Sequence, residues 1–375
     1  MSASWTVLVY MAADNNLSKP PKPGELSPLD ADLQAMMAAT IDPGANVIVE
    51  VVTTGGVMTR WQITQGTKTQ LDVKPASVIV DTGKPGPLTD FLNWGIQAYP
   101  SMNVAFVMWA HGDGVIDWGP ENAAPSGQPN PILVRGAPCA TGFSDTFKDY
   151  LTTADLAAAL AATAYCQGGG KLGVVVFDSC LMSMVEIGYQ IVASASYMVG
   201  CEIELMNPGL PYTTILSGMT SGLDAPGFAS LVVADYAATT NAETNSTLVA
   251  INLQKLPACA TAFTALVAVM TKQSAAVAAA RAAAPGIYYG YFVDIQILLT
   301  ALQQPLASDS VTNALAALQN SILPNPALAG PGIGGHCGVA MYYPTDPTLV
   351  KELPVYQALA FPAATGWGKL LATLL

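Results

Sequence analysis

Short apolar runs recur along the chain, and helix-like segments separate them. The runs are residues 5–12, 45–54, 103–110, 171–178 and 197–204. Several are apolar at successive positions, a pattern typical of strands that are buried on both faces. The helix-like segments between them are residues 29–40, 87–100, 151–164 and 181–193. This alternation predicts an α/β fold with a mostly parallel sheet sandwiched by helices.

Two segments interrupt the alternation. Residues 112–150 are rich in Gly, Pro, Asn and Ser, which predicts a long loop of the kind that is often functional. Residues from 224 onward become Ala-rich and helical, and residues 337–344 predict one more strand, which we expect to return to the main sheet. We therefore expect a core at 1–223, a mainly helical subdomain at 224–336, and a returning strand with a terminal helix at 337–375.

The composition limits the classes of function. Of the 375 residues, 51% are hydrophobic and 11% are charged, so the chain can bury a large core. The formal net charge of −12 argues against nucleic-acid binding and favours basic ligands or basic peptide segments.

The sequence also gives expectations about location. The opening MSASWTVLVYMAADNN has no basic start and no small-residue cleavage site, so we expect no secretory signal and a cytoplasmic protein. The apolar stretch 256–271 contains Pro257 and is shorter than the roughly 20 residues of a membrane-spanning helix, so no membrane span is predicted. The six cysteines are scattered without CxxC spacing and predict no disulfide framework.

Two predicted strands end in reactive residues. One delivers His111 and Gly112, and the other delivers Cys180. If the strands are parallel neighbours, both residues emerge at the same edge of the sheet, where a Cys–His pair could form a thiolate nucleophile. We expect Cys180 to begin a helix that lowers its pKa, and the N–H groups of Gly112 and Cys180 to form an oxyanion hole. A lone Cys after an apolar strand is more often a core residue, but its joint placement with His111 favours the catalytic interpretation.

Cofactor and metal motifs are weak. Gly330, Gly332 and Gly335 match G-x-G-x-x-G but precede a strand, whereas a dinucleotide fingerprint follows one. His336 and Cys337 are adjacent candidate ligands with no others nearby in sequence, so no metal site is predicted.

Several blocks resemble the clostripain family of cysteine peptidases. They are WTVLVYMAADNNL, LTDFLNWGIQAYP, FVMWAHGDG, VVVFDSCLMSMVEIGYQI, YMVGCEIELMNPGLPY and, near the end, GVAMYYP. The resemblance covers most of the chain in the right order. It implies a caspase-like fold, His111 as general acid/base, Cys180 as nucleophile, and cleavage after Arg or Lys. It requires no cofactor and leaves calcium binding open.

An acidic pocket would explain that specificity. Asp178 stands two residues before Cys180, and its carboxylate could pair with the guanidinium of the substrate residue that precedes the cleaved bond. The alternative is that Asp178 only caps the following helix. Glu202 and Glu204 could add negative charge to the same pocket, and so could Asp14, which could equally be a turn residue.

The sequence therefore predicts an Arg- or Lys-specific endopeptidase acting on proteins or peptides. Restraint of such an enzyme by self-processing or by a regulatory protein partner is expected, with cleavage after Arg135 favoured over Lys148. The alternatives are a catalytically silent caspase-like module that binds partners, and a defence or cell-death protease that acts on one partner protein.

Overall fold

A large mixed sheet forms the centre of the molecule. The computed structural model describes residues 3–71, 78–115, 141–206, 208–345 and 353–375. The strand order of the main sheet is β13-β11-β10-β9-β6-β1-β2-β3-β4, and β5 pairs with β3. The strands are β1 (Ala3–Ala13), β2 (Ala45–Thr53), β3 (Val57–Thr64), β4 (Thr67–Leu71), β5 (Val78–Ile79), β6 (Ser101–Trp109), β9 (Leu172–Asp178), β10 (Ala195–Gly200), β11 (Ser246–Asn252) and β13 (Ala327–Ala329). Strands β2, β1, β6, β9 and β10 are parallel, and antiparallel strands flank them. The predicted mostly parallel sheet is confirmed.

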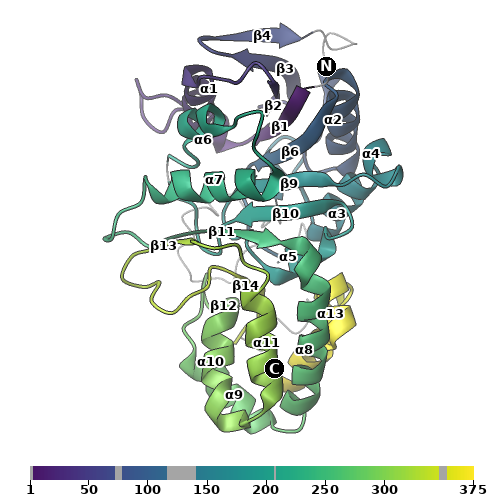
Figure 1. Cartoon of the computed structure of the whole chain (residues 1–375), viewed down its shortest axis with the longest axis vertical. Coiled ribbons are helices and arrows are strands. Elements are labelled where there is room, and N and C mark those ends of the chain that lie inside the picture. The colour runs from purple at the N-terminus through teal and green to yellow at the C-terminus, as the bar shows by residue number, and fades with distance from the viewer. Residues whose placement is uncertain (1–2, 72–77, 116–140, 207, 346–352) are drawn as a thin grey trace.

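Helices cover both faces of this sheet (Figure 1). Side chains of β1 alternate between two hydrophobic clusters: Val7 and Val9 lie in one, and Leu8 and Tyr10 lie in the other. The first cluster includes residues of α1 (Pro28–Ala38), α6 (Tyr212–Gly218) and α7 (Ala225–Ala237). The second includes residues of α2 (Pro85–Ala98), α3 (Thr153–Ala161) and α5 (Val185–Gln190), and the short α4 (Ala164–Gln167) follows α3. The strands are apolar at successive positions because both of their faces are buried.

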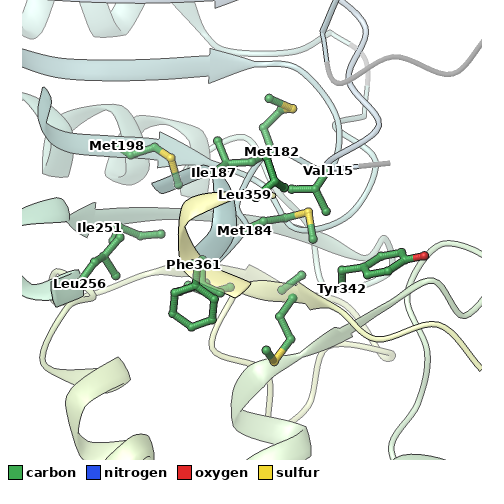
Figure 2. Close-up of a cluster of buried hydrophobic side chains, with 14 of the residues drawn as sticks. Val115, Met182, Met184, Ile187, Met198, Ile251, Leu256, Tyr342, Leu359 and Phe361 are labelled. Atoms are coloured by element: carbon green, nitrogen blue, oxygen red, sulfur yellow. The ribbon is translucent and has the colours of Figure 1, made fainter. Parts of the chain in front are cut away.

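A second group of helices lies beyond the β11 side of the sheet (Figure 1). It consists of α8 (Leu256–Met270), α9 (Ser274–Ala283), α10 (Ile295–Leu306), α11 (Asp309–Gln319), α12 (Leu353–Gln357), α13 (Ala360–Thr365) and α14 (Trp367–Leu374). The same group contains the ladder of β12 (Phe292–Asp294) with β14 (Ala340–Tyr342). We call this group the helical lobe. Its side chains Tyr342 and Phe361 belong to the same buried cluster as Met182 and Met184, so the lobe and the sheet share a core (Figure 2).

Two expectations about the second half of the chain are wrong. The strand predicted at 337–344 forms β14, which pairs with β12 and not with the main sheet. The predicted boundary between the core and a mainly helical subdomain at 224–336 is also wrong, because this region supplies β11 and β13 to the main sheet and α7 to the layer on its face. Strands β11 and β13 occupy the sheet positions beyond β10.

Helix α8 accounts for the apolar stretch near residue 260. By length and composition, Leu253–Met270 could cross a membrane, and 44% of this window is buried. Its buried residues include Leu256, Phe263 and Met270, which belong to the core shared with the sheet. We therefore interpret α8 as a core helix of the lobe.

The predicted loop at 112–150 contains regular structure near its end. Within it, β7 (Thr141–Ser144) and β8 (Asp149–Leu151) form a small antiparallel ladder. Residues 116–140, which include Arg135, lie outside the described residues.

Candidate active site

The register between β6 and β9 sets the position of the two predicted reactive residues. Trp109 pairs with Asp178 in a parallel ladder, and the N–H of Ala110 donates to the carbonyl oxygen of Asp178 at 3.2 Å. Each chain then continues for two residues, to His111 and to Cys180. The two residues therefore leave the same edge of the sheet on adjacent strands, as expected for the carboxyl ends of parallel strands.

Cys180 lies in a tight turn and not at a helix N-terminus. Helix α5 begins only at Val185, so the expected effect of a helix dipole on the thiol is absent at this position. Leu181, directly after Cys180, has a φ of 62°, which is an unusual conformation for a non-glycine residue. Its N–H donates to the carbonyl oxygen of Ile203, and the N–H of Ser183 donates to that of Cys201. The segment after β10 therefore clamps the turn that carries Cys180.

Gly112 lies close against the turn that carries Cys180. A Cβ atom placed on Gly112 would lie 2.4 Å from the carbonyl oxygen of Cys180 and 3.1 Å from the Cβ of Ser179. Gly112 also forms an isolated antiparallel bridge with Thr141. Glycine is required here because any side chain would push the His111 loop away from the Cys180 turn.

The imidazole of His111 is oriented by a residue that the sequence does not single out. Its Nε2 lies 2.8 Å from Oδ1 of Asn16, which follows the first strand. With a proton on Nε2, the other ring nitrogen is the free base. Burial lowers the pKa of His111, and the nearby Asp145 carboxylate opposes that shift. A neutral imidazole, ready to accept a proton, follows from this environment.

The thiol of Cys180 is neutral in this environment. Burial raises its pKa to about 11, and the carboxylates of Asp113, Glu204 and Asp178 act in the same direction. The N–H of Leu205 donates to Sγ at 3.3 Å and partly opposes the shift. The thiol therefore needs a base to become nucleophilic at neutral pH.

A cleft of about 410 Å³ opens beside these two residues. Its lining comes from the segment after β1, helix α1, the ends of β6 and β9, and the segment after β10. The lining residues are Asn16, Leu17, Lys19, Pro20, Pro21, Pro28, Asp32, Trp109, Ala110, His111, Asp178, Ser179, Cys180, Glu204, Leu205, Pro208 and Gly209. Three carboxylates and one lysine make the cleft acidic.

Two of these carboxyl groups are buried and interact. Asp178 is 6% exposed and accepts a hydrogen bond from the hydroxyl of Tyr212 at 2.6 Å. Asp32 is 7% exposed and accepts one from Nε1 of Trp109 at 2.6 Å. Burial raises the pKa of both, and the Asp178 charge raises that of Asp32 further. Asp178 does not cap α5, whose N-cap is Met184, so the alternative helix-cap role is wrong.

Asp32 is a site residue that the sequence interpretation missed, although a local signal exists. In α1 the buried positions are Leu29, Asp32, Leu33 and Met36, which form one stripe of the helix. An aspartate within an apolar stripe is unusual, because charged residues are rarely buried without a partner. The helical spacing of these four positions is therefore a local signal that marks Asp32 as a candidate site residue.

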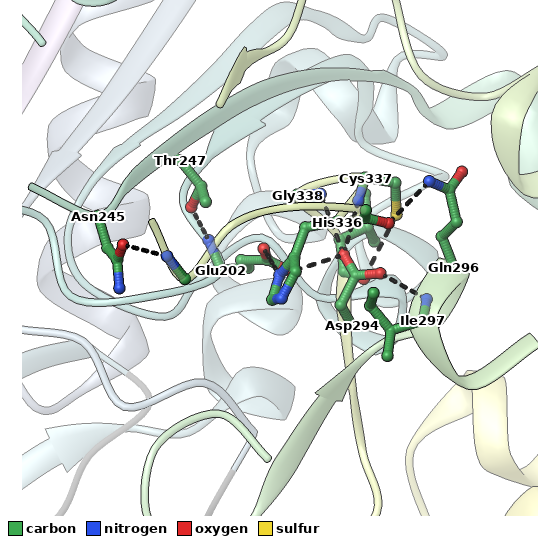
Figure 3. Close-up of polar contacts among 12 residues, drawn as sticks. Glu202, Asn245, Thr247, Asp294, Gln296, Ile297, His336, Cys337 and Gly338 are labelled. Carbon is green, nitrogen blue, oxygen red and sulfur yellow. Dashed lines mark hydrogen bonds and ion pairs between the residues drawn. The ribbon is translucent and has the colours of Figure 1, made fainter. Parts of the chain in front are cut away.

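Glu202 lies outside the cleft, in contrast to its predicted place in the substrate pocket. Its backbone follows β10, and its Oε1 lies 2.7 Å from Nδ1 of His336 (Figure 3). Asp294 completes this cluster, in which one ligand atom from each residue lies within 4.8 Å of the others. The cluster could hold a metal ion, and it contains His336, which the sequence had paired only with Cys337. Glu204, two residues further on, does line the cleft.

Two other sequence candidates have structural roles or lie at the surface. Asp14 accepts hydrogen bonds from Gly55 and Thr146 and anchors those loops, so it is not a pocket residue. Lys148 is exposed in the turn between β7 and β8.

A family model described as the clostripain family, peptidase family C11, matches residues 9–297. The chain belongs to the clostripain family. Its members are cysteine proteases, so this clostripain-family protein is assigned to that class of hydrolase. No curated protein matches it.

Solved structures agree with the family in fold. A secreted C11 cysteine protease from Bacteroides thetaiotaomicron, bound to an irreversible peptide inhibitor, has 20% identity and a TM-score of 0.70. A second secreted C11 structure from that organism, iotapain, has 17% identity and a TM-score of 0.74. An inactive zymogen C11 protease from Parabacteroides distasonis has 20% identity and a TM-score of 0.70. Each comparison covers 97% of this chain and 99% of the other. The caspase-like fold is confirmed.

Proposed function

We propose that this clostripain-family protein is an endopeptidase that cleaves after Arg or Lys through His111 and Cys180. The observation that carries the proposal is the pair of buried carboxyl groups, Asp178 and Asp32, in the same cleft as those two residues. A guanidinium or ammonium group that enters the cleft would place a positive charge beside both carboxyl groups and offset the repulsion between them.

The chemistry follows from the two reactive groups. His111 accepts the thiol proton as Sγ of Cys180 attacks the carbonyl carbon of the scissile peptide bond, and it then donates a proton to the leaving amine. The resulting thioester is hydrolysed by water, which His111 activates in turn. We assign the N–H groups of Gly112 and Cys180 as donors to the oxyanion. The neutral resting state of both groups favours this concerted proton transfer over a preformed ion pair.

Substrate comparison tests the specificity. Fluorogenic peptides that differ only in Arg, Lys or neutral citrulline before the cleaved bond isolate the charge. We expect Asp178→Asn and Asp32→Asn to lower kcat/KM for the Arg peptide by about thirtyfold or more, because a buried charge pair is worth about 2–5 kcal/mol. The citrulline peptide should lose little. The exposed Glu243, replaced by Gln, changes the net charge equally and serves as the control.

Loss of the nucleophile tests the reaction itself. Cys180→Ala should abolish turnover, and His111→Ala should lower it by several orders of magnitude, because the two residues act as a unit. In the substrate comparison, an equal fall in kcat/KM for the Arg and citrulline peptides in Asp178→Asn would show instead that Asp178 supports the turn. Full turnover in Cys180→Ala would contradict the peptidase assignment.

We also propose that the activity is restrained until the chain cleaves itself between the His111 and Cys180 blocks. The likeness in fold to an inactive zymogen is consistent with this idea.

Two of the similar structures are described as secreted, and the cytoplasmic location of this protein stays a prediction. Calcium binding also stays a prediction.

A further inference from the structure

Three side chains that are far apart in the sequence meet between the main sheet and the helical lobe (Figure 3). Glu202 follows β10, Asp294 ends β12, and His336 precedes β14. Nδ1 of His336 lies 2.7 Å from Oε1 of Glu202 and 3.9 Å from Oδ2 of Asp294. The cluster lies outside the catalytic cleft, so the proposed peptidase chemistry does not account for it.

Backbone groups hold the Asp294 carboxylate rigidly. Oδ1 accepts the N–H of Ile297 at 2.9 Å, and Oδ2 accepts the N–H groups of Cys337 and Gly338 at 2.8 and 3.1 Å. An ionised carboxylate offers about four acceptor positions, two on each oxygen, so about one remains, on Oδ1. Hydrogen bonds of this kind orient metal ligands in known sites. The capping of α10 explains these three bonds but does not explain why Glu202 and His336 are there.

Glu202 is the unexplained member. The residue is completely buried, and its Oε2 has no hydrogen-bond partner among the described residues. One oxygen of its carboxyl group lies within 4.8 Å of a carboxylate oxygen of Asp294. Two buried carboxyl groups in contact require either a shared proton or a cation.

We propose that Glu202, Asp294 and His336 bind a first-row divalent transition-metal ion such as Zn²⁺. An imidazole nitrogen with two carboxylate oxygens is a ligand set that Zn²⁺ accepts, whereas Ca²⁺ takes oxygen ligands alone. Two ligand atoms on a tetrahedral Zn²⁺ lie about 3.3 Å apart. One ligand atom from each of the three residues lies within 4.8 Å of the others, so small side-chain shifts complete the site.

The position of Glu202 gives the ion a structural role. Glu202 lies in the segment that clamps the nucleophile turn: Cys201 accepts the N–H of Ser183, and Leu205 donates to Sγ of Cys180. Asp294 lies within the helical lobe, at the end of β12, and His336 lies in the segment that connects β13 of the main sheet to β14 of the lobe. The ion therefore ties this clamp to the lobe without entering the cleft.

Metal titration of the full chain tests the site. The Cys180→Ala background removes the thiol that would otherwise bind Zn²⁺ in the cleft. We expect one Zn²⁺ per chain in competition with a chromogenic chelator. His336→Gln in this background should weaken binding about a hundredfold or more, whereas His111→Gln should retain it. These are the two histidines of the chain, so the variants are matched. Circular dichroism checks that both fold.

Co²⁺ gives a readout that needs no ligand variant. The Cys180→Ala protein loaded with Co²⁺ should show d–d absorption without a thiolate charge-transfer band, because Cys337 lies beside the site but is not one of the three ligands. A charge-transfer band would overturn this ligand set. The site itself is overturned if the folded Cys180→Ala protein binds no Zn²⁺, if His336→Gln binds it equally well, or if Ca²⁺ alone raises the melting temperature. None of these results bears on turnover of Arg peptides.

Discussion

Asp32 and Asp178 are held in the cleft against an electrostatic penalty. Both carboxyl groups are buried, and their charges repel, so each binds its proton more tightly in the folded chain than in the unfolded chain. Above the ordinary Asp pKa of about 4, the folded state therefore holds more protons than the unfolded state. Stability falls as the pH rises through this range, by linkage. Such a cost is typical of a binding site that a cationic ligand completes.

Replacing one of the two carboxyl groups should relieve this penalty. We expect Asp32→Asn to raise the free energy of unfolding at pH 8 by about 1–2 kcal/mol relative to the wild type. The difference should shrink toward pH 4, where both wild-type carboxyl groups are protonated in the folded state and no longer repel each other. Denaturant unfolding at several pH values measures this, with Glu243→Gln as the control. A stability difference that is the same at pH 4 and pH 8 would contradict the electrostatic explanation.

The reactivity of Cys180 should follow its raised pKa. Iodoacetamide reacts with the thiolate, and the pKa of Cys180 is raised to about 11 by burial and nearby carboxylates. The rate of alkylation of Cys180 should therefore rise about tenfold per pH unit from pH 7 to pH 9, without a plateau. Peptide mapping by mass spectrometry separates Cys180 from the other cysteines. A rate that is already constant at pH 7 would instead indicate a preformed ion pair with His111.

At the scale of elements, the site depends on the contact between the ends of β6 and β9. Gly112 lies against the carbonyl oxygen of Cys180, and neither backbone can move far, because the strands before them are paired in a buried sheet. The turn after Cys180 is also clamped by the segment after β10. Precise spacing at this contact therefore comes from the sheet and not from the loops themselves.

Gly112→Ala should disturb this spacing. The added Cβ would approach the carbonyl oxygen of Cys180 to 2.4 Å and separate the two loops. We expect kcat/KM to fall about a hundredfold, because a displacement of about 1 Å at reacting groups has an effect of this size. Gly86→Ala, in helix α2, is the control, because its Cβ would meet nothing within 4 Å. Equal activity of the two variants would show that the contact is not needed for catalysis.

At the scale of the whole molecule, the His111 and Cys180 blocks are joined by a long segment that includes β7 and β8. Lys148 lies exposed in the turn between these strands, with a φ of 56°, and Arg135 lies outside the described residues. A protease cleft binds substrates in an extended conformation, and a tight turn between paired strands does not offer one. This geometry disfavours Lys148 and is consistent with the preference for Arg135.

Self-processing can be followed by fragment masses. We expect the wild type to be cut after Arg135 and Cys180→Ala to remain intact. Arg135→Gln should block the cut, whereas Lys148→Gln should leave it unchanged. An active enzyme that stays full length, or fragments that form equally in Cys180→Ala, would refute self-processing and leave the peptidase assignment untouched.

The sequence by itself determined the central sheet and the placement of His111 and Cys180 at the ends of adjacent strands. Strands buried on both faces must be apolar at successive positions, so the central strands are visible in the sequence. His111 and Cys180 each follow such a strand, and parallel neighbours bring their ends together. The burial of Asp32 was also encoded locally, as a charge within the apolar stripe of α1.

Only the tertiary structure decided which distant side chains meet. The apolar run of β14 is compatible with any ladder, and only the structure shows that it pairs with β12 and not with the main sheet. Glu202 and Glu204 are two residues apart in sequence, yet one meets His336 and the other lines the cleft. Asp32 and Asp178, and likewise Glu202, Asp294 and His336, are brought together by the folding of separate elements. Local periodicity carries no information about such encounters, because it records which face of an element is buried and not what lies opposite.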